Sequence, residues 1–204
     1  MKLQEKQELI TYLSNFASVA RRQKILSVLQ QRTRYVTVIL EDIYQPHNAS
    51  AVLRSCDSFG VQDVHIVENK NIFTVTHGVT IGSDRWLTLH RYNQPGINNT
   101  DECLQKLKSQ GYTIAATTLY KEQITIEELS VNKKVALMFG SEISGLSEYA
   151  QNNADVSVKI PMMGFSESFN ISVSAALCLY DVINRLKKEH HNCCLLYTSD
   201  AADD

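Results

Sequence analysis

Short apolar runs alternate with amphipathic segments along most of the chain. The runs are rich in β-branched residues, which is typical of buried strands. We expect strands at residues 35–40, 64–67, 112–117, 134–139 and 156–160. Strands that alternate with helices form a mostly parallel sheet covered on both faces. The pattern therefore predicts an α/β fold.

The segments between the runs have helical periodicity. Helices are expected at residues 48–59, 101–110 and 171–186, with Asn48 as the N-cap of the first and Gly60 and Gly111 as C-terminal caps of the first two. The last helix is expected to bury one apolar face, made of Val173, Leu177, Tyr180 and Ile183. Ligands of such sheets bind beyond the carboxyl ends of the strands, so we expect the chemistry in the loops after Leu40, Thr117, Phe139 and Ile160.

The length of 204 residues, 44% of them hydrophobic, suits one domain with a small appendage. Apolar residues at helical spacing over residues 3–31 predict two short helices, broken near residues 14–18. We divide the chain into a helical extension (1–33), a main domain (34–189) and a tail (190–204). Residues 195–204 lack periodicity and resemble a translated cloning sequence, so they are left out of the fold prediction.

Charge is unevenly distributed, although the net charge is only -2. The stretch from residue 21 to 34 has no acidic residue and five basic ones: Arg21, Arg22, Lys24, Arg32 and Arg34. These side chains form either a solvated helix face or a surface that binds phosphates of a nucleic acid.

The five cysteines are scattered without a CxxC pair, and no apolar run is long enough to cross a membrane. These features predict a reduced, cytoplasmic protein without a membrane role. His190, His191, Cys193 and Cys194 lack the spacing of zinc ligands, so no metal is expected.

Two loops contain candidate chemistry. Residues 140–147 have the two-glycine spacing of a phosphate-binding loop, but Leu146 stands where that motif requires lysine. No G-x-G-x-x-G fingerprint follows any expected strand, which argues against a common dinucleotide site. Residues 161–170 are rich in hydroxyls and amides; by themselves they could be an ordinary turn capped by Ser168 or Asn170.

Three motifs taken in order resemble the SpoU family of ribose 2′-O-methyltransferases. They are Asn48 followed by Arg54, the sequence FGSE at 139–142 with Gly145, and the segment from IPM at 160–162 to SFNISVS at 168–174. The resemblance covers residues 20–189 and is greatest to the members that methylate guanosine 18 of transfer RNA. It implies the SPOUT fold, in which a C-terminal trefoil knot holds S-adenosylmethionine.

The resemblance also implies partners and ligand contacts. The family is dimeric, and its active site draws on both chains. Backbone groups matching seven positions here would hold the cofactor: Thr117, Thr118, Leu119, Gly140, Ile160, Met162 and Phe169. The basic N-terminal stretch would bind tRNA, although the additional helix before it departs from the shortest members.

Five residues match the family's catalytic positions: Asn48, Arg54, Glu142, Ser168 and Asn170. A guanidinium is effectively never deprotonated, so we expect Arg54 to anchor the target phosphate and not to act as the base. Glu142 is expected to hold Asn48 or Arg54, while Ser168 and Asn170 orient the ribose or the backbone. Methylation of another tRNA or rRNA nucleotide, a non-catalytic RNA-binding member of the fold and a small-molecule transferase are the alternatives.

Overall fold

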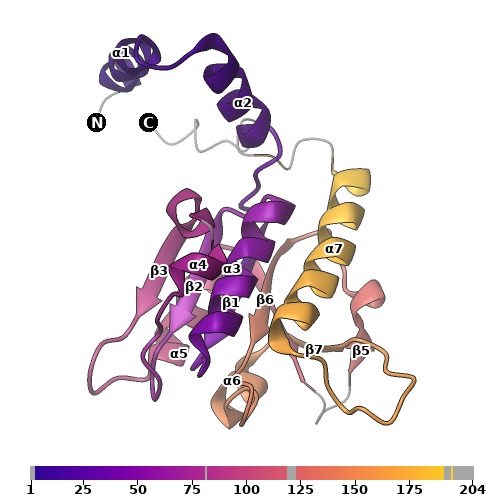
Figure 1. Ribbon diagram of the computed structural model, residues 1–204. Coiled ribbons are helices and arrows are strands. Elements are labelled where there is room, and N and C mark those ends of the chain that lie inside the picture. The colour runs from indigo at the N-terminus through magenta and orange to yellow at the C-terminus, as the bar shows by residue number, and fades with distance from the viewer. Residues whose placement is uncertain (1–2, 81, 119–122, 191–193, 195–204) are drawn as a thin grey trace.

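Seven strands form one parallel sheet in the part of the chain that the computed structural model describes, residues 3–80, 82–118, 123–190 and 194 (Figure 1). They are β1 (Val36–Glu41), β2 (Asp63–Val67), β3 (Thr88–Tyr92), β4 (Tyr112–Thr117), β5 (Ile124–Thr125), β6 (Lys134–Phe139) and β7 (Val156–Lys159). Their order across the sheet is β3-β2-β1-β6-β4-β7-β5, and all pairs are parallel. The predicted α/β class is confirmed, and all five expected strands are present within one residue of their expected ends.

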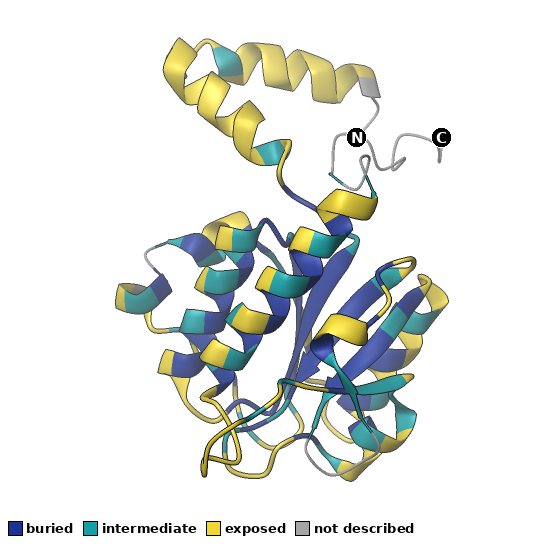
Figure 2. Ribbon diagram, turned by 90° about the vertical axis from the view of Figure 1, so that its right-hand side faces the viewer, coloured by how far each residue is buried: buried dark blue, intermediate teal, exposed yellow. Residues whose placement is uncertain are grey.

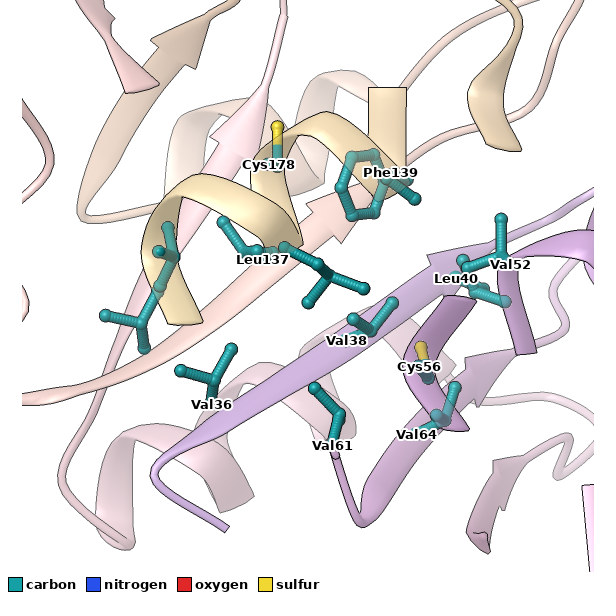
Figure 3. Packing of buried hydrophobic residues seen from close by; sticks show 14 of the residues in the cluster. Val36, Val38, Leu40, Val52, Cys56, Val61, Val64, Leu137, Phe139 and Cys178 are labelled. Atoms are coloured by element: carbon teal, nitrogen blue, oxygen red, sulfur yellow. The ribbon is translucent and has the colours of Figure 1, made fainter. Parts of the chain in front are cut away.

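Helices cover both faces of the sheet. The pair α3 (Pro46–Phe59) and α7 (Ile171–Glu189) packs on one face, and α5 (Asn99–Ser109) and α6 (Glu148–Asn153) pack on the other. Strand β1 is buried throughout and serves both cores: Val38 points toward α3 and α7, and its neighbour Ile39 points toward α5. Figure 3 shows side chains of β1, α3, β6 and α7 meeting in the first core.

The N-terminal extension consists of α1 (Leu3–Ser14) and α2 (Val19–Leu29), with the expected break between them. Ser18 caps α2 by accepting a hydrogen bond from the backbone N–H of Arg21 at 3.2 Å. No residue of α2 is buried, and the two helices stand away from the sheet (Figure 2). The prediction of two short helices is confirmed.

Helix α3 begins earlier than expected. Its first residue is Pro46 and its N-cap is Gln45, so the prediction of Asn48 as the cap was wrong. Proline suits the first helical position because it has no N–H to leave unsatisfied and its φ is already helical. Asn48 therefore lies inside the first turn, where its side chain is buried. Gly60 ends the helix as expected, with a φ of 81°.

The orientation of α7 was wrongly predicted, and two strands, β3 and the two-residue β5, were not expected. Of the four residues expected in the core face of α7, only Ile183 is buried; Val173, Leu177 and Tyr180 are 43%, 41% and 62% exposed. The segment after β2 contains α4 (His77–Thr80), the 3-10 helix η1 (Ser83–Trp86) and then the unexpected edge strand β3. Another 3-10 helix, η2 (Ile126–Glu128), follows β5.

Candidate active site

A cavity of about 560 Å³ opens beyond the carboxyl ends of β4, β6 and β7. Six of the residues expected to hold the cofactor line it: Thr117, Thr118, Gly140, Ile160, Met162 and Phe169. Leu119, the seventh, lies outside the described residues. The predicted position beyond the strand ends therefore agrees with the structure, since three separate loops meet there.

The loop after β6 forms one wall of the cavity and is closed by two backbone hydrogen bonds. Ser141 N–H donates to the Gly145 carbonyl at 3.1 Å, and Gly145 N–H donates to the Ser141 carbonyl at 2.8 Å. Gly140 packs directly on the far end of this loop, because a Cβ there would lie 2.2 Å from the backbone of Gly145 and Leu146. Only glycine fits at residue 140, so the loop has one compact shape.

Three polar side chains from different elements form a hydrogen-bonded network at the cavity. Asn48 Nδ2 donates to Glu142 Oε1 at 2.8 Å, and Asn48 Oδ1 accepts from Asn170 Nδ2 at 3.1 Å. Asn170 in turn caps α7, where its Oδ1 accepts from Ser172 N–H at 2.9 Å. The expected contact between Glu142 and Asn48 is present. Because each amide is used on both sides, the network joins α3, the loop after β6 and the start of α7.

Glu142 also accepts from the backbone N–H of Tyr44 at 3.1 Å, just before α3. This places its carboxylate beside the N-terminus of α3, where the helix dipole favours negative charge. Ser168 lines the same cavity, close in sequence to Asn170. Four of the five residues expected to be catalytic therefore lie together.

Arg54 is the exception. It is exposed and lines a second cavity of about 600 Å³, with Ser55 and Ser58 of α3 and Gly78 and Val79 of α4. It lies six positions after Asn48 on the same helix, which is about 9 Å of rise and a different face. Among the described residues no carboxylate forms an ion pair with Arg54, so its guanidinium is available to an anion.

The five basic residues of the N-terminal stretch do not form one surface. Arg21, Arg22 and Lys24 are exposed on α2. Arg32, in contrast, is 4% exposed, pairs with Asp57 and donates to the Val61 carbonyl at 3.0 Å. The expectation that Arg32 contacts RNA is therefore corrected. The buried guanidinium has a structural role, because it connects the extension to the end of α3. Arg34 is bonded to Asp63 at 2.8 Å.

Glu41 is a supporting residue that the motifs did not reveal. It is 1% exposed at the end of β1 and accepts from Thr100 Oγ1 at 2.5 Å and from both Ser147 N–H and Ser147 Oγ at 2.8 Å. Ser147 follows the loop after β6 and caps α6. A buried carboxylate is stable only when it is bonded in this way, so Glu41 fixes the base of the cavity wall. Its position at the end of a buried strand was the available signal.

Cys178 also lines the cavity, and its burial, with a smaller effect of Asp181, raises the pKa of the thiol to about 12. The thiol therefore stays protonated near neutral pH and is a poor nucleophile. Within the described ranges, no three His, Cys, Asp or Glu side chains are grouped as metal ligands. No described helix has the length and apolar character of a membrane span.

Comparison with known proteins gives consistent matches. The model of the SpoU rRNA Methylase family matches residues 35–180. The tRNA (guanosine(18)-2′-O)-methyltransferase of Borreliella burgdorferi is 43% identical over 88% of this chain and 80% of its own length. The enzyme of the same name from Thermus thermophilus is 38% identical over 79% of this chain and 81% of its own length.

Among solved structures, the TrmH/SpoU tRNA modifying enzyme of A. aeolicus superimposes with a TM-score of 0.75 at 28% identity. The superposition covers 83% of this chain and 84% of that one. The family match spans β1 to most of α7 and includes the whole hydrogen-bonded network of Asn48, Glu142 and Asn170. The chain belongs to the SpoU rRNA Methylase family.

Proposed function

We propose that this protein transfers a methyl group from S-adenosylmethionine to the 2′-hydroxyl of a ribose in transfer RNA, at guanosine 18. The observation that carries the proposal is the network of Asn48, Glu142 and Asn170 at the mouth of the cavity. The relatives named above, which share most of the chain's length, are named for this reaction.

The cavity suits the methyl donor in shape and charge. Apolar side chains such as Ile160, Met162 and Phe169 alternate with exposed backbone and hydroxyl groups, which fits a ligand with a flat base and a polar chain. Two carboxylates, Glu142 and Glu167, and one ammonium, Lys159, are among the lining groups. That balance favours a ligand with net positive charge. When bound, S-adenosylmethionine supplies a methyl group activated by its sulfonium.

The protein's own residues align the acceptor. The network fixes the orientation of the Asn48 and Asn170 amides, so each can present a defined polar group to the ribose. Arg54, a permanent cation with five N–H donors, anchors the phosphate next to that ribose in our proposal. Its separate cavity supports a division of roles in which Arg54 holds RNA while the first cavity holds the donor.

A homodimer is part of the proposal for two reasons. Within one chain, Arg54 lies away from the other site residues, and an apolar face of α7 is exposed. Val173, Leu177 and Tyr180 recur on one side of α7 and are exposed, and Phe169 at the cavity is 41% exposed. Contiguous apolar surface of this kind is typical of subunit interfaces. In our proposal, a partner packed on this face supplies its Arg54 to this cavity, as the resemblance to the family implies. The trefoil knot implied by the family remains a prediction, as does the division into extension, domain and tail.

Cytoplasmic location is proposed on the same basis. Transfer RNA is modified there, and the buried thiols of Cys56, Cys103 and Cys178 are free, as expected in a reducing compartment.

The test uses an unmodified tRNA transcript, an rRNA fragment and S-adenosylmethionine labelled in its methyl group. After incubation, each RNA is digested and the labelled nucleoside is identified and mapped. We expect 2′-O-methylguanosine at position 18 of the tRNA. A label on a base, or on rRNA alone, would contradict the proposal.

A further inference from the structure

Trp86, the only tryptophan of the chain, has no evident role in the core. It ends η1, and 54% of the residue is exposed. The segment is fixed by other groups: Gln62 Nε2 donates to the Trp86 carbonyl at 3.1 Å, and the next residue, Leu87, is buried. The backbone is therefore anchored while the indole is held at the surface.

The surroundings of the indole are cationic. The guanidinium carbon of Arg21, from α2, lies 5.7 Å from the ring centroid, in the range of a cation–π contact. Arg85, next to Trp86, is exposed, as are Arg22 and Lys24 on α2. Asp84 has one carboxylate oxygen buried. An exposed aromatic ring among basic side chains has the two features of a surface that binds single-stranded nucleic acid, a stacking group and positive charge.

The position of Trp86 connects two surfaces already described. Gly78 and Val79 of α4 form one wall of the Arg54 cavity, and η1 is the next element along the chain. Both α4 and η1 pack along α3, and the basic helix α2 stands beyond the carboxyl end of α3 (Figure 1). From Arg54 to Gly60 the helix rises by about 9 Å. The ring of Trp86 thus contacts α2 through Arg21, and its 3-10 helix packs on α3, the helix that contains the proposed phosphate anchor.

We propose that Trp86 and Arg21 form a stacking platform for an unpaired base of the tRNA, close to the nucleotide that is methylated. Bases in single-stranded loops are commonly recognised by stacking on aromatic rings and on arginine planes. The inference rests on the proposed function, since it assumes a tRNA substrate. It adds a contact that none of the three motifs contains, and it gives the extension a second purpose besides attracting phosphates.

The experiment uses the intrinsic fluorescence of the full-length protein, which reports on Trp86 alone because the chain has one tryptophan. Unmodified tRNA transcript is titrated in with excitation at the red edge of the tryptophan band, and affinity is measured separately by filter binding. We expect quenching that saturates with binding. Trp86→Leu should weaken tRNA affinity by about 5- to 150-fold, the range of one stacked base, while Trp86→Phe should retain most of it.

Tyr149→Leu is the matched control, since it removes an exposed aromatic ring from α6, on the opposite face of the sheet. It should leave tRNA affinity unchanged. Urea unfolding of each variant checks that the fold is intact. Trp86→Phe, which keeps an aromatic ring at this position, separates loss of stacking from loss of stability.

The outcomes separate this inference from the proposed function. If the wild-type protein methylates tRNA while Trp86 emission and the affinity of Trp86→Leu are unchanged, the platform is refuted and the function stands. A change in emission with protein concentration in the absence of RNA would assign Trp86 to a contact between protein copies and would also refute it. Failure of the wild-type protein to methylate any tRNA would refute the proposed function.

Discussion

Replacing Gly140 by alanine should damage the cofactor cavity more than any other single methyl group added to a glycine lining it. The new Cβ would lie 2.2 Å from the Gly145 carbonyl carbon and from the Leu146 nitrogen. Non-bonded carbon atoms prefer separations of about 3.5 Å or more, so two backbone segments must move apart by more than about 1 Å. The bonds between Ser141 and Gly145, at 3.1 and 2.8 Å, close this loop and would be disturbed first.

The magnitude follows from the contacts at risk. Overpacking of this kind costs about 1–3 kcal/mol, and each lost hydrogen bond about 1 kcal/mol. If most of that cost is borne by the loop carrying Glu142, the dissociation constant for S-adenosylmethionine should rise by roughly 10- to 100-fold. Isothermal titration calorimetry measures the affinity, and urea unfolding measures the loss of stability.

Gly164→Ala is the control for this substitution. It adds the same methyl group to the exposed loop before α7, where a Cβ would meet nothing within 4 Å. Its affinity and stability should match the wild type. If Gly140→Ala bound the cofactor as well as Gly164→Ala does, the compact loop would not be what shapes the cavity.

Three further predictions concern separate parts of the molecule. Arg54→Ala should bind S-adenosylmethionine normally by calorimetry while methyl transfer to tRNA collapses, because Arg54 lines a different cavity; equal loss of both would refute the division of roles. Burial, reinforced by His90, lowers the pKa of His65 to about 3, so the unfolded chain alone takes up this proton below pH 6.5. The free energy of unfolding should therefore fall by about 2 kcal/mol from pH 6.5 to 5 because of this residue. Measured by urea unfolding, His65→Asn should lose less stability over this range by the same amount. Identical pH profiles for the two proteins would contradict the assignment. Neutralising Arg22 and Lys24 should weaken tRNA binding and reduce the slope of its log–log salt dependence by about one unit per lost phosphate contact. An unchanged slope would mean that the basic face of α2 is only solvated.

Much of the fold was predictable because its signals are local. Strands β1, β4 and β6 are mostly apolar and mostly buried, and Gly60 marks the end of α3. The edge strand β3 was missed because its sequence, TLHRY, mixes polar and apolar residues and is only partly buried. Edge strands of this kind have no uninterrupted apolar run to detect.

The face of α7 could not be chosen from periodicity alone, since both sides of the helix are apolar. The buried side uses Ala175, Cys178, Leu179, Val182 and Leu186, whose smaller members fit close to the sheet. The exposed side is the one proposed to meet a second subunit. Periodicity reports that a residue is apolar, but it does not distinguish a core from an interface.

The sequence predicted which residues belong to the site better than it predicted where each of them lies in the structure. The three motifs identified Asn48, Glu142 and Asn170, which the fold brings into contact although up to 122 positions separate them. Arg32 and Arg22 look alike in the sequence, yet one is buried against Asp57 and the other is exposed. That difference depends on which side chain is opposite in the folded chain, and the local sequence does not contain it.

The acceptor atom is the central claim, and one substrate tests it most directly. A full-length tRNA transcript with 2′-deoxyguanosine at position 18 keeps the base edges and the phosphates and lacks only the hydroxyl. We expect it to bind with at most a modest loss of affinity, since the 2′-hydroxyl is one of the groups by which proteins recognise RNA. It should accept no methyl group at that nucleotide. Continued methylation there would mean that a base is the acceptor and would contradict the account.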